Sequence, residues 1–295
     1  MKLFLGLLTS HHLRRLKRLV RSIQEANHEP NVDLNPVIVV NTLNDSYYQE
    51  VLAEGFPYPV VRTESNGRPG KGKNSVAELF LQSDCDFMTQ IDGDDLFYPT
   101  YLQSLWQHVK RYPSIDVLGL IPADFIKVEK PTAGHIFAVG DLWASVWGTS
   151  LGTPYPNGGP GRGEWLDQLL PKSQDFTILQ SKKSAKFKID EHIAVGEDHL
   201  YTMKLLSEHQ KGAINYFQSM SSDIYLIDST TENSVQKQFP QLEWVDELKQ
   251  KGLMYLNDWR SNFGELPVVY HELLMNQWEK QEWIIKWQKE LYLDA

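Results

Sequence analysis

The most informative part of this 295-residue sequence is the stretch Phe87-Met88-Thr89-Gln90-Ile91-Asp92-Gly93-Asp94-Asp95-Leu96-Phe97-Tyr98-Pro99. It predicts a short buried strand that ends in carboxylates, followed by a helix from Pro99 to about Lys110. Asp92 and Asp94 stand two residues apart, so an extended backbone would point both side chains to one side. Mg²⁺ or Mn²⁺ would relieve the repulsion among these acids, because hard cations prefer carboxylate and water oxygens. On spacing alone, a polar turn that starts the next helix explains the residues equally well.

The context of these acids resembles a known family. An apolar strand that ends in Asp-x-Asp-Asp, followed by an aromatic residue and a proline, resembles the metal site of the nucleotide-sugar glycosyltransferases with the GT-A fold, and above all the large inverting family 2. The resemblance implies a mostly parallel α/β sheet flanked by helices, with a Rossmann-like half that binds the nucleotide. It also implies that Asp94, helped by Asp92 or Asp95, holds Mn²⁺ or Mg²⁺ on the donor diphosphate.

Predicted strands and helices alternate along the first third of the chain, which is typical of a parallel sheet. The expected strands are residues 3–8, 36–40 and 58–62, and the expected helices are residues 13–23, 47–54 and 75–81. Ligands of such sheets bind at the carboxyl ends of the strands, where Thr9, Asn41 and Asp92 lie. In family 2 the second strand usually ends in an acid that meets the base. Asn41 departs from that pattern and brings donors as well as an acceptor, so the base stays open, with a UDP-sugar favoured.

A glycine-rich basic loop is expected at Asn66-Gly67-Arg68-Pro69-Gly70-Lys71-Gly72-Lys73-Asn74. Its glycines would let the backbone approach a phosphate, and its cations would supply charge. Read as a P-loop, it has Asn74 where Ser or Thr is needed to reach Mg²⁺. The family 2 pattern here is an Asn-x-Gly stretch followed by a basic residue and Asn. That resemblance assigns Asn66 and Lys73 to donor binding, and a P-loop kinase or NTPase centred on Lys73 is the rival interpretation.

A second acidic pair occurs at Glu197-Asp198, where an amphipathic helix is predicted to begin. A carboxylate at a helix start can simply cap the helix. The stretch resembles the Glu-Asp motif that lies beside the acceptor in family 2. The resemblance implies a general base that takes the proton of the acceptor hydroxyl. Because the second acid of the pair usually has that role, Asp198 is the expected base and Glu197 its neighbour in the catalytic site.

The predicted organisation is a GT-A-like domain over residues 1–230, with a donor-binding half at 1–112 and an acceptor half at 113–230. A helical extension follows at 231–295. A long Gly- and Pro-rich segment, residues 148–163, is expected to be a lid, an acceptor loop or an irregular excursion. The Trp-rich end of the extension could pack on its own domain, form a homodimer face or touch a membrane surface peripherally.

Composition excludes several classes of protein. Hydrophobic residues make up 41% and charged residues 23%, as in ordinary globular proteins. The formal net charge of -9 lacks the basic footprint of a nucleic-acid binder, so no nucleic-acid partner is expected. Cys85 is the single cysteine and suits a reducing compartment, which favours a cytoplasmic location. No apolar run approaches the length of a transmembrane segment.

The sequence therefore predicts a metal-dependent transferase that moves a sugar, with inversion, from a nucleotide-diphosphate sugar to a hydroxyl of a glycan, a lipid-linked molecule or a protein. A non-catalytic binder of nucleotide sugars or carbohydrates that keeps the fold is the alternative from another class. The basic run at residues 14–21 is expected to be a solvated helix face, with contact to an anionic surface or acceptor as the other interpretation.

Overall fold

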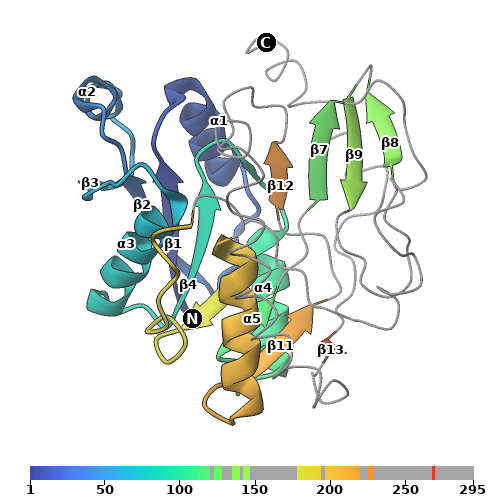
Figure 1. Cartoon of the computed structure of the whole chain (residues 1–295). Coiled ribbons are helices and arrows are strands. Elements are labelled where there is room, and N and C mark those ends of the chain that lie inside the picture. The colour runs from blue at the N-terminus through green and yellow to red at the C-terminus, as the bar shows by residue number, and fades with distance from the viewer. Residues whose placement is uncertain are drawn as a thin grey trace.

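The computed structural model describes residues 1–119, 178–193 and 197–219, and five further strands at 123–127, 135–139, 142–146, 225–228 and 268–269. Figure 1 shows the arrangement of these elements. The predicted 148–163 segment and all of the predicted extension except Val268–Val269 lie outside the described residues. The predicted boundary near residue 230 therefore stays a prediction.

The elements follow one another in an alternating order. The first are β1 (Lys2–Thr9), α1 (Leu13–Gln24), β2 (Asp33–Val40), α2 (Asp45–Ala53), β3 (Val60–Arg62), α3 (Pro69–Gln82), β4 (Phe87–Asp92), β5 (Leu96–Phe97) and α4 (Tyr101–Arg111). They are followed by β6 (Val117–Gly119), β7 (Ala123–Lys127), β8 (His135–Val139), β9 (Leu142–Val146), β10 (Ile178–Ser181), α5 (Glu197–Gln210), β11 (Tyr216–Ser219), β12 (Tyr225–Asp228) and β13 (Val268–Val269).

Among the described residues the strands form two sheets. The larger has the order β13-β11-β6-β10-β4-β1-β2-β3, and the smaller has the order β5-β12-β7-β9-β8. In the larger sheet β10 runs antiparallel to both of its neighbours, and the other paired strands are parallel. This arrangement confirms the predicted α/β fold with a mostly parallel sheet flanked by helices.

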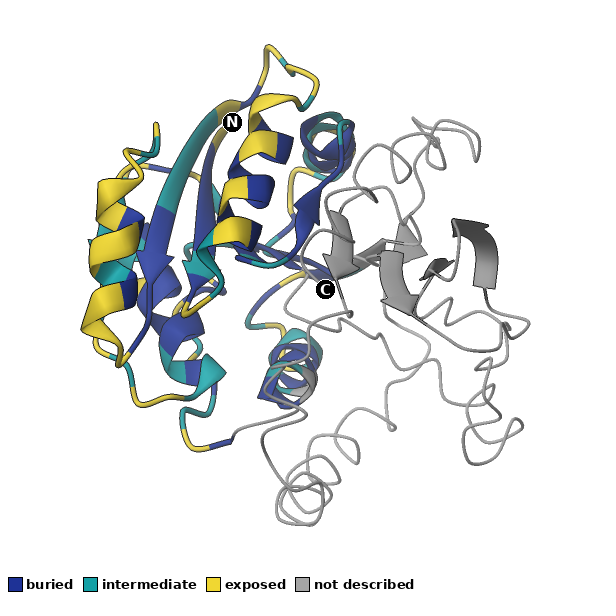
Figure 2. Cartoon of the chain, turned by 90° about the horizontal axis from the view of Figure 1, so that it is seen from above, coloured by how far each residue is buried: buried dark blue, intermediate teal, exposed yellow. Residues whose placement is uncertain are grey.

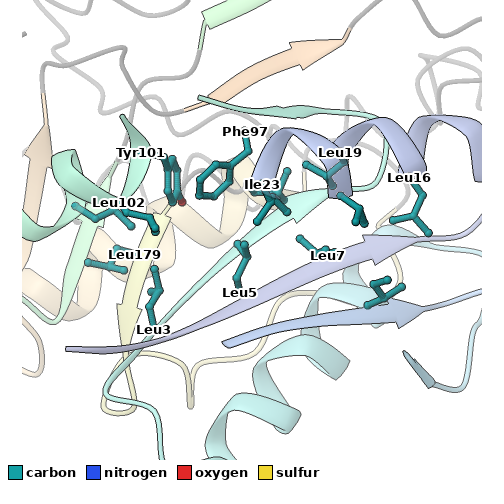
Figure 3. Close-up of a cluster of buried hydrophobic side chains, with 14 of the residues drawn as sticks. Leu3, Leu5, Leu7, Leu16, Leu19, Ile23, Phe97, Tyr101, Leu102 and Leu179 are labelled. Carbon is teal, nitrogen blue, oxygen red and sulfur yellow. The ribbon is translucent and has the colours of Figure 1, made fainter. Parts of the chain in front are cut away.

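The two faces of β1 belong to two different cores, which explains its continuous apolar run. Leu3, Leu5 and Leu7 point to the face covered by α1 and α4, where Figure 3 shows them against Leu16, Leu19, Ile23, Phe97 and Tyr101. Phe4 points to the opposite face and packs with Val76 and Phe80 of α3. Both layers exclude water from the central strands, and Figure 2 shows that the helices expose only their outer sides.

The predicted loop at Asn66–Asn74 is largely helical, which corrects the expectation from its glycines. Helix α3 begins at Pro69, where a proline is favourable because its missing N–H is not needed at the first helical position. Residues 69–72, which a P-loop would wrap around a phosphate, are the first turn of this helix. Gly70 is buried, and a Cβ there would collide with the carbonyl oxygen of Asp190. The structure gives no support to a P-loop.

Several strands were not predicted from the sequence. These are β5, β7, β10, β11 and β13. Val268–Val269 extends the larger sheet by pairing in parallel with β11, so the predicted extension, residues 231–295, contains at least one strand. β5 pairs with β12, and the chain therefore passes from the larger sheet into the smaller one immediately after the carboxylate turn.

Candidate active site

Three of the predicted site residues meet at one edge of the larger sheet. Thr9 is the last residue of β1, Asn41 directly follows β2, and Asp92 is the last residue of β4. The register pairs Leu8 with Asp92 and Thr9 with Val40, so these strand ends are aligned. This meeting at the carboxyl edge of the parallel strands is where ligands of open α/β sheets bind.

A tight turn presents the acids beyond β4. The N–H of Gly93 donates to the carbonyl oxygen of Leu8 at 2.7 Å, and the N–H of Asp95 donates to the carbonyl oxygen of Asp92 at 3.0 Å. A Cβ at Gly93 would lie 2.9 Å from the Cβ of Thr9, so only glycine fits this approach between the two strand ends without a shift. Asp92 and Asp94 remain partly exposed, whereas Asp95 is buried at 3% exposure.

Helix α1 supports this turn from behind. Arg18 is 4% exposed, and its Nη2 donates to the backbone oxygen of Asp94 at 2.6 Å. Arg15 is also buried, so the expectation that the whole basic run of α1 is solvated is wrong for these two residues. The Arg18 guanidinium at the acidic turn offsets part of its negative charge.

The second acidic pair lies where α5 begins, as predicted, since Glu197 and Asp198 are the first two residues of that helix. Nζ of Lys73 on α3 donates to Oε1 of Glu197 at 2.6 Å, and both side chains are buried. Asp198 is partly exposed. The predicted contact between Lys73 and a donor diphosphate therefore stays a prediction, because the described partner of its ammonium is Glu197.

The pKa values show that the two acidic motifs share one electrostatic site. Burial raises the pKa of Asp92 to about 6, and repulsion by Asp94, Glu197 and Asp198 adds to this, while Lys73 opposes it. Burial and the charge of Asp198 likewise raise the pKa of Glu197 against the pull of Lys73. Burial disfavours the Lys73 ammonium, but the surrounding carboxylates outweigh burial and raise its pKa. The Lys73 ammonium and the Arg18 guanidinium behind the turn offset only part of the charge of these four carboxylates, so a further cation would be favourable here.

The other predicted donor residues have well-defined partners. The Thr9 hydroxyl shares a hydrogen bond with the Tyr47 hydroxyl. Nδ2 of Asn41 donates to Oγ1 of Thr63 at 3.0 Å and to the backbone oxygen of Glu64 at 2.9 Å, so both of its amide hydrogens are used. An open groove begins beside Asn41, and its lining residues are Thr42, Leu43, Arg62, Thr63, Glu64 and Ser65. Asn41 itself is buried at this strand end, and its Oδ1 is the part of its amide that these two hydrogen bonds leave as an acceptor.

Asn66 lies away from the acidic turn and contacts the segment that leads into α5. Its Nδ2 donates to the backbone oxygen of Glu191 at 3.0 Å, and the Arg68 guanidinium donates to the backbone oxygen of His192. Asn74, a buried residue of α3, bonds the same segment at Ile189 and Glu191. Sequence reasoning matched Asn74 to the Asn of the family 2 pattern but did not predict this contact, because its partners lie more than a hundred positions away.

The carboxylate turn fits a divalent cation only in part. Asp92 and Asp94 offer partly exposed oxygens in a cluster with excess negative charge, which suits Mn²⁺ or Mg²⁺. Asp95 fits less well, because it is buried within the turn. Across residues 1–119 and the other described segments, no group of three or more Asp, Glu, His or Cys side chains is arranged to hold a metal by itself. The predicted metal ligands therefore stay a prediction.

Comparisons with known proteins identify the fold. No family model matches the sequence, and no curated protein matches it either. A crystal structure of S. aureus TarS residues 1–349 in complex with UDP-GlcNAc matches with a TM-score of 0.55 and 15% identity, over 89% of this chain and 73% of that one. The same TarS fragment in complex with UDP matches with a TM-score of 0.50 and 17% identity, over 96% and 78% of the two chains. At this identity the similarity shows a shared α/β fold.

Within the portion of the chain that the structure describes, none of the helices is long and apolar enough to cross a bilayer.

Proposed function

We propose that this chain is a glycosyltransferase that moves a sugar, with inversion, from a nucleotide-diphosphate sugar to an acceptor hydroxyl. One observation carries the proposal: Asp92 ends β4 beside Thr9 and Asn41 at the carboxyl edge of the sheet, where open α/β sheets bind ligands. The pKa shifts of Asp92 and Glu197 agree with Glu197 and Asp198 lying near Asp92. The fold is shared with TarS, which was crystallised with UDP-GlcNAc and with UDP. The acids after β4 and the acids at the start of α5 come from separate segments of the chain. Together they could contact two substrates at once, which suits a transfer reaction between them.

A uridine nucleotide is the favoured donor because of Asn41. Where family 2 usually has an acid at this place, Asn41 has both amide hydrogens engaged by Thr63 and Glu64. Only its carbonyl oxygen is left for a ligand, so it acts as an acceptor, as a carboxylate does. The N3–H of uracil is a donor that such an oxygen can accept. Thr9 and Asp92 lie at the neighbouring strand ends. We call the ends of β1, β2 and β4, with Thr9, Asn41 and Asp92, the donor edge.

Asp198 is the proposed general base. Glu197 is committed to a buried ion pair with Lys73, whereas Asp198 is partly exposed at the same helix start. Asp198 would take the proton from the acceptor hydroxyl while that oxygen attacks the anomeric carbon on the side opposite the nucleotide. The bond from that carbon to the diphosphate breaks, the nucleoside diphosphate leaves with the electron pair, and the anomeric configuration inverts.

Asp92 and Asp94 are the proposed ligands of Mn²⁺ or Mg²⁺. Asp95, the third predicted ligand, is buried inside the turn. A bound divalent cation would neutralise charge on the leaving diphosphate. The Lys73 ammonium adds positive charge to the same cluster, and a direct contact with the diphosphate is part of this proposal. The carboxylates, once paired with a cation, would be relieved of the mutual repulsion described above.

The proposal is tested by incubating the full chain with a panel of UDP-sugars, beginning with UDP-GlcNAc, with and without Mn²⁺. We expect Mn²⁺-dependent release of UDP that increases when a suitable glycan, lipid-linked or protein acceptor is added. Binding of the nucleotide sugar without release of UDP under any condition would favour the non-catalytic binder. Release of phosphate from ATP, with no binding of UDP-sugars, would contradict the proposal.

A further inference from the structure

The segment that leads into α5 is held by the side-chain amide of Asn74. The N–H of Ile189 donates to Oδ1 of Asn74 at 2.9 Å, and Nδ2 of Asn74 donates back to the carbonyl oxygen of Ile189 at 3.0 Å. Nδ2 also donates to Oε1 of Glu191 at 2.8 Å. The amide therefore pairs with both backbone polar groups of Ile189, as a neighbouring strand would. Asn74 is only 3% exposed, so its two bonds to Ile189 are shielded from water.

One turn earlier on α3, Gly70 allows this segment to approach the helix. A Cβ at Gly70 would collide with the carbonyl oxygen of Asp190, between the two residues that Asn74 holds. Gly70 and Asn74 stand four residues apart and so share one face of the helix. On the exposed side of this contact, Asn66 donates to the backbone oxygen of Glu191, and Arg68 donates to the backbone oxygen of His192.

Helix α3 also contacts the start of α5, the helix that carries the proposed base. Lys73, the residue before Asn74, forms the buried ion pair with Glu197, which directly precedes Asp198. Consecutive residues of one helix thus fix the chain at two points, at Ile189 and at the start of α5. The proposed base lies one residue beyond the second point. Neither Asn74 nor Ile189 lies among the residues proposed to touch donor, metal or acceptor.

We propose that Asn74 is a positioning residue that acts through Asp198: by fixing Ile189–Glu191 against α3, it sets where the base-bearing start of α5 stands relative to the acidic turn after β4. This inference rests on the proposed function. Displacement of a reacting group by about 1 Å can cost roughly 100-fold in rate. Loss of the amide should therefore reduce turnover and leave the donor edge, which is built from β1, β2 and β4, unchanged.

The test compares Asn74→Ala with Ser75→Ala in the full chain. Ser75 is the adjacent buried residue, and its hydroxyl bonds only within α3, to the backbone oxygen of Lys71, so it controls for loss of a buried polar group from this helix. For Asn74→Ala we expect kcat for UDP-sugar turnover to fall by about 10- to 100-fold, with KM for the donor and the Kd of UDP with Mn²⁺ within about twofold. Ser75→Ala should change none of these by more than about twofold.

A double-mutant cycle separates positioning from a general loss of structure. In an Asp198→Asn background the same Asn74→Ala change should cost less than about twofold, because the group through which it acts is already disabled. Amide exchange at residues 187–193 should accelerate in Asn74→Ala, while β1 stays protected. If Asn74→Ala does not fold, Asn74→Asp, which keeps the shape and the acceptor for Ile189, takes its place with the same expectations.

The outcomes are distinguishable. Equal losses from Asn74→Ala in the native and Asp198→Asn backgrounds, or a loss confined to donor KM, would overturn the positioning role while the glycosyltransferase function stands. Absence of turnover by the unmodified chain with every UDP-sugar and acceptor tried would overturn the proposed function, and this inference with it.

Discussion

The Lys73 ammonium and the Glu197 carboxylate form a buried hydrogen-bonded ion pair, 2.6 Å from Nζ to Oε1. This pair joins helix α3 to the start of α5 across 124 positions of the sequence. Exposed pairs of the same kind contribute little, whereas a buried charge that loses its partner is costly because it has no water to replace it. The pair thus links the stability of the domain to the placement of its second acidic motif.

The stability of the domain should depend on both members of this pair. Lys73→Met leaves Glu197 buried beside other carboxylates and should lower the free energy of unfolding by about 3–5 kcal/mol. Lys73→Met/Glu197→Leu should recover most of that loss, because an apolar replacement of the whole pair leaves no unpaired charge. Urea denaturation measures both. Lys188→Met, which breaks the exposed pair between Glu78 of α3 and the segment before α5, is the control and should cost less than about 1 kcal/mol. Similar losses for Lys73→Met and Lys188→Met would contradict this account.

Metal-dependent nucleotide binding should depend on Asp94. Asp94 is partly exposed on the turn after β4, and Asp94→Asn removes one charge of the proposed metal site while keeping the side-chain shape. Calorimetric titration of UDP in the presence of Mn²⁺ should show at least a tenfold weaker Kd, equivalent to about 1.4 kcal/mol. Asp84→Asn, at the other end of β4 and exposed, makes the same charge change and should leave the titration unaltered. An unchanged Kd in Asp94→Asn would remove Asp94 from the metal site.

Nucleobase recognition should depend on the acceptor oxygen of Asn41. UDP offers an N3–H to this oxygen, and 3-methyl-UDP does not, so the chain should bind UDP at least tenfold more tightly, or by about 1.4 kcal/mol. In Asn41→Ala the preference should shrink, because the discriminating acceptor is gone. Thr9→Val is the matched comparison at the neighbouring strand end and should retain the preference. Equal binding of the two nucleotides by the unmodified chain would show that Asn41 does not read the base.

The sequence predicted the strands that carry the site, because their signals are local. The strands that became β1, β2 and β4 are marked by apolar residues followed by polar ones, and a strand end fixes which edge of a parallel sheet its last side chains reach. The start of α5 at Glu197 was predicted for the same kind of reason, since acids at the first turn precede an amphipathic repeat.

The role of the Asn66–Asn74 stretch could not be predicted from its composition. Glycine and proline are typical of loops, but Pro69 occupies the first position of a helix, and Gly70 is needed for contact with the backbone of Asp190. That contact joins residues more than a hundred positions apart. Nothing local in the sequence shows that the Lys73 ammonium is buried and paired with Glu197, 124 positions further along the chain.

Turnover should depend on Asp198 far more than nucleotide binding does. A hydroxyl is a poor nucleophile at neutral pH, and a positioned base typically contributes about 10²–10⁴-fold. Asp198→Asn keeps the shape but cannot take the proton, so single-turnover sugar transfer should fall by about that factor while the Kd of UDP stays within about twofold.

Glu208→Gln, near the end of the same helix and paired with Lys211 at the surface, is the charge-matched control. Glu197→Gln is less suitable as a control, because it also disturbs the buried pair with Lys73. The anomeric configuration of the product, read by NMR, should be opposite to that of the donor. Near-normal transfer by Asp198→Asn, or a product that retains the configuration, would exclude Asp198 as the base of an inverting reaction.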